Sequence, residues 1–169
     1  MENLILVAAI GKNNELGLDN NLIWKIQEDL SFYRRLTVHN NIIMGRKTFE
    51  SMPLRALEDR NVFVISSKNI DQNYNVNCFN NIEVLLDYIR ITNEPFIVVG
   101  GSQIYEQLLP FVNIMYLTEI DEYANADTFF PEINIDEWDV ETIYYNNEVD
   151  YTSDNIPYVR NKYVRKRVK

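Results

Sequence analysis

The chain has 169 residues, of which 46% are hydrophobic and 12% aromatic, and this composition excludes a disordered chain and predicts one domain over residues 1–169. Its net charge of −9 disfavours a protein that binds nucleic acid through the phosphate backbone. A single cysteine, Cys78, allows no internal disulfide, and a single histidine, His39, leaves no His/Cys cluster for a metal such as zinc.

The first predicted element is the apolar run Leu4 to Ile10. Continuous hydrophobicity over seven residues is typical of a central strand that is buried on both faces. The run is too short to cross a membrane and has no basic segment before it. We therefore expect a cytoplasmic protein with no membrane partner.

A loop is predicted over Gly17 to Trp24, because a glycine is followed by the turn-forming residues Asp19, Asn20 and Asn21. A loop that ends in a large aromatic residue, just before a helix with an inward-facing acid, is a candidate lid over a binding site. An ordinary connection from a strand to a helix, with Trp24 in the core, explains this stretch equally well.

The helix that follows, Ile26 to Thr37, places one carboxylate on its apolar face. At 3.6 residues per turn, Asp29 lies on the same arc as Phe32 and Tyr33, whereas Glu28 lies on the opposite, solvent side. A carboxylate that points into an apolar region is costly unless something pairs with it, and such acids concentrate at functional sites. The alternative is that the acids complement the helix dipole, which suits Glu28 but does not explain the inward direction of Asp29.

A turn at Asn40-Asn41 and a short buried strand, Ile42 to Met44, precede the segment Gly45-Arg46-Lys47-Thr48. This segment opens a short helix that ends near Met52. Free backbone N–H groups, the helix dipole and two cations predict an anion site at this point. A solvated basic turn is the alternative.

The irregular segment Pro53 to Asp59 leads to a predicted strand, Asn61 to Ile65, which ends in Ser66-Ser67-Lys68. Open α/β sheets bind ligands at the carboxyl ends of their strands. Because this cluster and Arg46-Lys47 follow successive strands, we expect a phosphate group to be held between them.

A loop with a short strand near Val76 is expected over Asn69 to Asn81, and apolar residues at helical spacing predict a helix over Ile82 to Ile91. The buried strand Phe96 to Val99 then stops at Gly100-Gly101. Ser102 is predicted to cap the next helix, Gln103 to Leu109.

Two glycines between a strand and a helix let phosphates approach the backbone closely. The Gly100-Gly101 pair is a weak signal by itself, and a plain tight turn is its usual explanation. The G-x-G-x-x-G fingerprint of a standard dinucleotide site is missing.

The last predicted elements are the strand Ile114 to Ile120, which carries Thr118, and two strands near Val140 to Tyr145 and Tyr158 to Arg167. An acidic loop, Asp121 to Asp127, follows the first of these strands. The other two should form an antiparallel hairpin across a polar loop. The predicted fold class is α/β: a three-layer α/β/α sandwich with a mostly parallel central sheet and an antiparallel C-terminal hairpin.

Taken in order, these segments resemble the dihydrofolate reductase family along nearly the whole chain. The motifs that carry the resemblance are Leu16-Gly17 with Trp24, Asp29-Leu30 with Thr37, Ile43 to Ser51, Arg60 before a strand that ends in Ser66-Ser67, Val99 to Tyr105, Leu117-Thr118 and Asp127 to Pro131. Each motif is modest alone, but their order and spacing are highly specific.

The resemblance implies reduction of 7,8-dihydrofolate to tetrahydrofolate with NADPH, by hydride transfer to C6 and protonation at N5. It implies that Asp29 hydrogen-bonds the pterin and favours its protonation, with a water delivering the proton. Thr118 matches the threonine that hydrogen-bonds this carboxylate. The implied catalytic group is Asp29, Thr118 and the loop residues Leu22 and Trp24.

The resemblance also implies two binding sites and no metal. The implied substrate site has an acid, apolar walls and an arginine for the glutamate α-carboxylate: Val7, Ala8, Asp29, Leu30, Tyr33, Met52, Leu57, Arg60, Val99, Tyr105 and Thr118. The implied NADPH site has loop residues, two cationic strand ends and a glycine pair that the family joins by a cis peptide bond: Ala9, Leu16, Gly17, Leu22, Gly45, Arg46, Lys47, Thr48, Ser66, Ser67, Lys68, Val99, Gly100, Gly101, Ser102, Gln103, Ile104 and Tyr105.

The chain departs from the family pattern at two places. Ile23 stands where proline is usual before Trp24, so we expect a more flexible loop. Glu58-Asp59 stand where Pro-Gly is common before Arg60, so we expect a weaker grip on the glutamate tail.

Two other functions remain open for this fold. One is a reductase of a ribityl-pyrimidine in riboflavin synthesis, and the other is a non-catalytic pterin or nucleotide binder. The expected partners are dihydrofolate and antifolate inhibitors, with no nucleic acid, and the expected state is a monomer.

Overall fold

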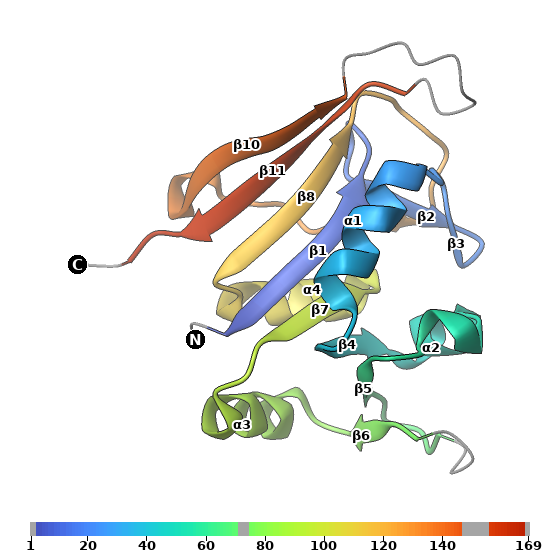
Figure 1. Cartoon of the computed structure of the whole chain (residues 1–169), viewed down its shortest axis with the longest axis vertical. Helices are drawn as coiled ribbons and strands as arrows, with labels where there is room; N and C mark the ends of the chain where they lie inside the picture. The colour runs from blue at the N-terminus through green and yellow to red at the C-terminus, as the bar shows by residue number, and fades with distance from the viewer. Residues whose placement is uncertain (1–2, 71–74, 147–155, 168–169) are drawn as a thin grey trace.

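The computed structural model of the protein describes residues 3–70, 75–146 and 156–167 (Figure 1). Most described strands join one eight-stranded sheet, in the order β10-β11-β8-β1-β7-β4-β5-β6. These strands are β1 (Leu4–Ile10), β4 (Asn41–Gly45), β5 (Asn61–Ile65), β6 (Asn77–Phe79), β7 (Phe96–Gly100), β8 (Ile114–Ile120), β10 (Trp138–Asn146) and β11 (Tyr158–Arg165).

The pairing directions confirm the predicted sheet. The strands from β8 to β6 pair in parallel, and β11 is antiparallel to both β8 and β10. β1 lies near the middle between β7 and β8, as its continuous hydrophobicity predicts.

Helices cover both faces of the large sheet, which confirms the three layers. They are α1 (Gln27–Thr37), α2 (Arg46–Ser51), α3 (Ile82–Thr92) and α4 (Ser102–Leu108), with short 3₁₀ turns η1 (Leu54–Ala56), η2 (Leu109–Phe111) and η3 (Ile135–Glu137). Side chains of β1 alternate between the two cores, so that Leu6 packs with α3 and α4 whereas Val7 packs with α1 and α2. In Figure 1, α1 crosses in front of the sheet and α4 lies behind it.

A second, three-stranded sheet occupies the place of the predicted lid loop. It consists of β2 (Glu15–Leu18), β3 (Asn21–Leu22) and β9 (Thr128–Phe129), with β2 in the centre. The prediction of a plain loop over Gly17 to Trp24 is therefore wrong at its start. A glycine is needed there because a Cβ on Gly17 would lie 2.9 Å from the Asn21 carbonyl oxygen and 3.1 Å from Thr128 Oγ1.

Some predicted boundaries also need correction. Asn41 begins β4 rather than completing a turn, because its buried amide donates to Pro95 O at 3.0 Å and ties β4 to the segment before β7. The short strand expected near Val76 is β6, one residue later. Residues 71–74 and most of the polar loop before β11 (147–155) lie outside the described residues. Across the described ranges, no helix has the length and apolarity to cross a membrane.

Candidate active site

The site begins with a row of side chains that crosses the sheet beneath α1. Ala9 on β1 is in register with Thr118 on β8, and Thr118 is in register with Arg160 on β11. Residues opposite each other in neighbouring strands point to the same face of a sheet. This register places the Thr118 hydroxyl and the Arg160 guanidinium side by side under the first turns of α1, which carry Asp29.

The structure brings two of the four predicted catalytic side chains, Asp29 and Thr118, into direct contact. Thr118 Oγ1 donates a hydrogen bond of 2.5 Å to Asp29 Oδ1. Thr118 is buried, whereas the Asp29 side chain keeps 20% of its surface exposed. The inward direction of Asp29 is therefore confirmed, and the carboxylate remains reachable from outside.

Arg160 completes this group, and the sequence analysis missed it by treating it only as part of the last strand. Its side chain is 2% exposed. Nη2 donates to Asp29 Oδ1 at 2.8 Å, and Nε donates to Thr118 Oγ1 at 3.1 Å. The guanidinium also lies 4.0 Å from the centre of the Phe32 ring. The sequence did contain one indication of Arg160, because a carboxylate that faces inward needs a cationic partner.

Glu28 does not face solvent as predicted. It is half-buried and accepts hydrogen bonds from Arg160 Nη1 at 3.1 Å, Arg160 Nη2 at 2.8 Å and the Tyr158 hydroxyl at 2.7 Å. Burial alone would raise the pKa of Glu28, but these hydrogen bonds and the charge of Arg160 outweigh it and hold the pKa below its ordinary value. The prediction from helical spacing was wrong here because Arg160 of β11 contacts both acids in the first turn of α1.

The predicted apolar walls lie mainly between α1, α2 and the sheet. Val7 and Val99 are buried there, and Tyr33, Met52 and Leu57 pack against the same cluster with part of their surface exposed. Leu30 is exposed at the edge of this region. Ala8, by contrast, points to the core on the α3–α4 side.

Tyr105 of α4 connects the two sides of the sheet. Its buried hydroxyl donates to Val7 O at 2.8 Å, and its ring packs against Phe130. Burial raises the pKa of Tyr105 far above its ordinary range, so the hydroxyl keeps its proton.

Arg60 is held in a defined position at the other end of α1. Its Nε donates to Thr37 Oγ1 and its Nη1 to Glu58 O, both at 2.9 Å. Glu58 thus contacts the arginine through its carbonyl group, and no ion pair in the described ranges joins Arg60 to Glu58 or Asp59. The guanidinium retains further N–H donors beyond these two bonds, and its central carbon lies 5.9 Å from the centre of the Tyr33 ring.

The beginnings of α2 and α4 lie next to each other on β4 and β7. Gly45 and Gly101 precede these helices, and neither helix has a side-chain cap. Ser102 is the first residue of α4, so its predicted role as a cap is wrong. The Gly100–Gly101 peptide is cis, as the resemblance implied. A Cβ on Gly101 would lie 3.1 Å from Thr48 Oγ1, so Gly101 and the Thr48 side chain form a narrow cradle that a larger residue would fill.

The predicted phosphate cluster is only partly available. Arg46 Nη1 contacts both carboxylate oxygens of Glu50 at 2.9 and 2.8 Å. Ser66 Oγ accepts from Lys68 N and donates to Lys68 O, which closes the turn after β5. Lys47, Ser67 and Lys68 are exposed, and no ion pair among the described residues involves either lysine.

On α4, Gln103 is exposed and Ile104 is buried against Gly45. The lid segment lies over the end of β1. Trp24 packs with Ala9, Ile120 and Tyr158, and its indole Nε1 donates to Glu122 Oε2 at 3.1 Å. Leu16 packs against the main core, whereas Leu22 at the tip is 56% exposed.

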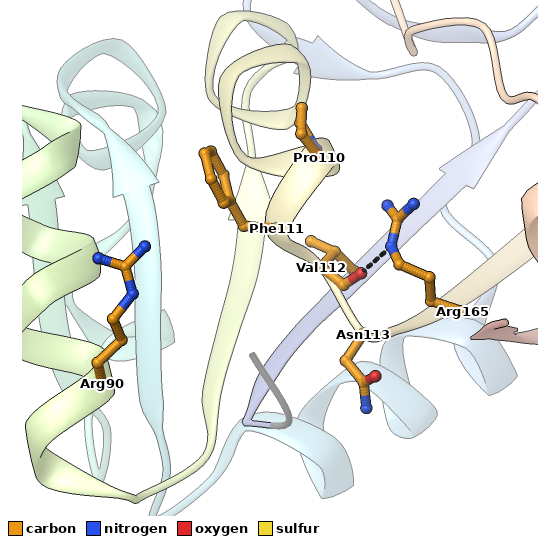
Figure 2. A pocket seen from close by; sticks show the side chains of 6 residues that line it. All are labelled: Arg90, Pro110, Phe111, Val112, Asn113 and Arg165. Carbon is orange, nitrogen blue, oxygen red and sulfur yellow. Dashed lines mark hydrogen bonds between the residues drawn. The ribbon is translucent and has the colours of Figure 1, made fainter. Parts of the chain in front are cut away.

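A cavity of about 230 Å³ lies at the opposite, amino-terminal edge of the strands (Figure 2). Figure 2 shows Arg90 and Arg165 on its two sides, with Arg165 Nε donating to Val112 O at 2.8 Å. Both arginines already pair with acids, Asp87 and Glu137. This cavity therefore does not belong to the Asp29 site.

Comparison with known proteins gives one consistent result. The family model described as dihydrofolate reductase matches residues 3–165. The chain is 35% identical over 136 residues to dihydrofolate reductase of Haemophilus influenzae, covering 80% of this chain and 83% of that enzyme. It is 37% identical to the enzyme of Staphylococcus haemolyticus, covering 79% of each. Among solved structures, dihydrofolate reductase from Enterococcus faecalis, complexed with NADP(H) and RAB-propyl, has a TM-score of 0.84 at 30% identity and covers 97% of this chain and 96% of that one.

Proposed function

The chain belongs to the dihydrofolate reductase family, and from this premise we propose that Asp29 is the acid that binds the pterin ring. The protein is an NADPH-dependent oxidoreductase that converts 7,8-dihydrofolate to 5,6,7,8-tetrahydrofolate. The observation that carries the assignment of Asp29 is its short hydrogen bond from buried Thr118, combined with a carboxylate that is still partly exposed.

Asp29 serves the reaction by binding and by charge. The pterin presents an amino group and a ring nitrogen on one edge, and a carboxylate accepts hydrogen bonds from both. Both protein donors to Asp29 end on Oδ1, which leaves Oδ2 for the substrate. A fixed negative charge at this edge favours protonation of the ring at N5, because an imine accepts hydride at C6 more readily once it is protonated.

The described residues fit NADPH, which supplies the hydride when it is bound. The uncapped N-termini of α2 and α4 offer backbone N–H groups to the pyrophosphate, with Gly100, Gly101, Ser102 and Gln103 in the cradle. Lys47, Ser67 and Lys68 bind the phosphate on the adenosine ribose, and their exposure supports this role. Arg46 reaches it only by sharing its bond to Glu50.

The remaining assignments follow the same premise. Arg60 receives the glutamate α-carboxylate with the donors that Thr37 and Glu58 leave unused. Leu22 and Trp24 exclude water from the nicotinamide side as parts of the lid. Antifolate inhibitors compete for the substrate site.

We further propose that residues 1–169 act as one domain and as a monomer in the cytoplasm, without a nucleic-acid partner. The net charge of −9 and the single cysteine support this. Size-exclusion chromatography with light scattering should give one species near 20.0 kDa.

The test measures loss of NADPH absorbance on addition of dihydrofolate, for the wild type and for Asp29→Asn. We expect turnover in the wild type and a loss of at least about 100-fold in the variant at neutral pH, as is typical for removal of a charge-stabilising group. Absence of turnover in the wild type, despite NADPH binding, would favour a ribityl-pyrimidine substrate or a silent binder.

A further inference from the structure

Arg160 lies where the proposed chemistry takes place, although nothing above assigns it a role in that chemistry. Its register partners are Thr118 on β8 and Tyr144 on β10. The pairing of β10 with β11 skips Ile143, and this bulge brings the Tyr144 ring within 5.3 Å of the guanidinium. The Phe32 ring of α1 lies closer to the guanidinium, at 4.0 Å. Two rings and three strands therefore fix the guanidinium plane against rotation.

The contacts of Arg160 determine how Asp29 is held. Because Thr118 Oγ1 accepts from Arg160 Nε, the Thr118 proton is directed to Asp29 Oδ1. Arg160 Nη2 donates to the same oxygen. Two donors at one oxygen fix the rotation of the carboxylate and leave Oδ2 for the substrate.

Two carboxylates share one buried guanidinium at this contact. Glu28 and Asp29 on α1 face the buried cation Arg160, and Arg35 on α1 approaches Glu28 only at 3.9 Å. The other titratable groups nearby are Tyr158 on β11, Tyr144 on β10 and Tyr116 on β8, which packs against Phe32. Burial alone would lower the pKa of Arg160, but its bonds to Glu28 and Asp29 raise it, so Arg160 stays charged.

We propose that Arg160 is a positioning residue that holds the Asp29 carboxylate through Oδ1 and sets the pH range in which the bound substrate is protonated. The proposal rests on the proposed role of Asp29. A fixed cation within hydrogen-bond distance of the carboxylate opposes a second positive charge on the pterin. The chain therefore reaches full protonation of its substrate at a lower pH than it would with a neutral residue at this position.

The test compares single-turnover hydride transfer across pH in the full chain for the wild type, Arg160→Met and Arg165→Met. We expect Arg160→Met to move the falling limb of the profile upward by about one pH unit or more, the usual effect of removing a charge within 4–6 Å. Arg165→Met removes a cation from the same strand, where it pairs with Glu137 far from Asp29, and should leave the profile in place. Superimposable profiles for Arg160→Met and wild type would overturn the proposal.

Folding defects are controlled by two further variants, because Arg160→Met leaves two carboxylates without their cation. Glu28→Gln/Arg160→Met removes one of these charges as well and should still show an upward shift relative to Glu28→Gln. Arg160→Lys keeps the positive charge but loses the several fixed N–H donors of the guanidinium. Its pH profile should therefore stay at the wild-type pH, while the rate of hydride transfer falls several-fold. An unchanged rate in Arg160→Lys, or no shift in the double variant, contradicts the proposal.

The Asp29→Asn assay separates this inference from the proposed function. If the wild type fails to reduce dihydrofolate, the proposed function fails. If the wild type is active and Asp29→Asn is not, but Arg160→Met has the wild-type profile, only the role of Arg160 fails.

Discussion

Two tyrosines of the proposed substrate site, Tyr33 and Tyr105, differ in what their hydroxyl groups contact. Tyr105 Oη donates to the Val7 carbonyl at 2.8 Å. Tyr33 Oη is buried and has no hydrogen-bond partner among the described residues. A buried polar group without a partner destabilises the folded state, whereas a satisfied one contributes about 1 kcal/mol.

We therefore predict opposite effects of the same substitution on stability. Tyr33→Phe should raise the free energy of unfolding by up to about 1 kcal/mol, because it removes an unsatisfied hydroxyl. Tyr105→Phe should lower it by about 1–2 kcal/mol, because the Val7 carbonyl loses its donor. Urea unfolding of both variants without ligand measures this. Equal losses in the two variants would contradict the prediction.

For single residues, the sequence predicted the positions of side chains that lie close together in the chain, on one helix or at one strand end. The inward direction of Asp29 followed from its place on a helical arc, and its contact with Thr118 followed from the family resemblance. Arg160 did not follow, because its bond to Asp29 joins residues 131 positions apart. No local pattern marks one cation of a basic strand as the partner of a distant acid, and Glu28 was misplaced for the same reason.

At the scale of elements, Glu15 of β2 connects the loops around the lid. Its buried carboxylate accepts from Asn13 N at 2.8 Å and from Ala124 N at 3.2 Å, so one side chain ties the β1–β2 turn to the acidic loop after β8. Burial alone would raise the pKa of Glu15, but hydrogen bonds from backbone N–H groups lower it below its ordinary value of 4.5.

Because of these contacts, we predict that Glu15→Gln lowers the stability of the fold and that the size of this effect depends on pH. A carboxylate whose pKa is lower in the folded state stabilises the fold above its ordinary pKa and loses this effect as pH falls through the folded value. At pH 7 the free energy of unfolding of the variant should be about 1–2 kcal/mol lower than that of the wild type. The difference should shrink below pH 4.5. Thermal unfolding at several pH values measures it.

A matched control removes a neighbouring charge that has no such role. Asp121 pairs with Lys12 on the surface, and both side chains are largely exposed. Asp121→Asn should change stability by less than about 0.5 kcal/mol at every pH. If the loss of stability in Glu15→Gln stayed constant down to low pH, the charge of the Glu15 carboxylate would not be its cause.

The elements that the sequence predicted are those with a strong local pattern. β1, β4, β5 and β7 are continuous apolar runs, and α1 and α3 have clear helical spacing. The small sheet was missed because two of its strands have only two residues each. Its pairing of Gly17 with Thr128 depends on a contact between distant segments, which no window of sequence contains.

At the scale of the whole molecule, the net charge of −9 opposes the approach of an anionic cofactor. Local features must therefore supply the attraction. The free N-termini of α2 and α4, with Lys47 and Lys68 beside them, lie at the carboxyl edge of the parallel strands. Arg90 lies at the other edge, in the cavity of Figure 2.

This distribution predicts that the position of a cation, and not the total charge, decides cofactor binding. NADPH at 100 times its Kd should stabilise the wild type by about 2.7 kcal/mol, which corresponds to a rise in Tm of about 5–10 °C. Lys47→Gln should weaken NADPH about tenfold and so reduce this rise to roughly half.

The control is Arg90→Gln, which changes the net charge by the same single unit at the opposite edge of the sheet. NADPH should raise the Tm of this variant as much as it raises the Tm of the wild type. NADH lacks the 2′-phosphate that NADPH carries on its adenosine ribose, so the Tm rise that NADH causes should be the same in Lys47→Gln and the wild type. Differential scanning fluorimetry of the three proteins with each cofactor measures these shifts. If Arg90→Gln reduced the Tm rise with NADPH as much as Lys47→Gln does, the long-range electrostatic field of the whole protein would govern binding. The cationic strand ends would then not form the phosphate site.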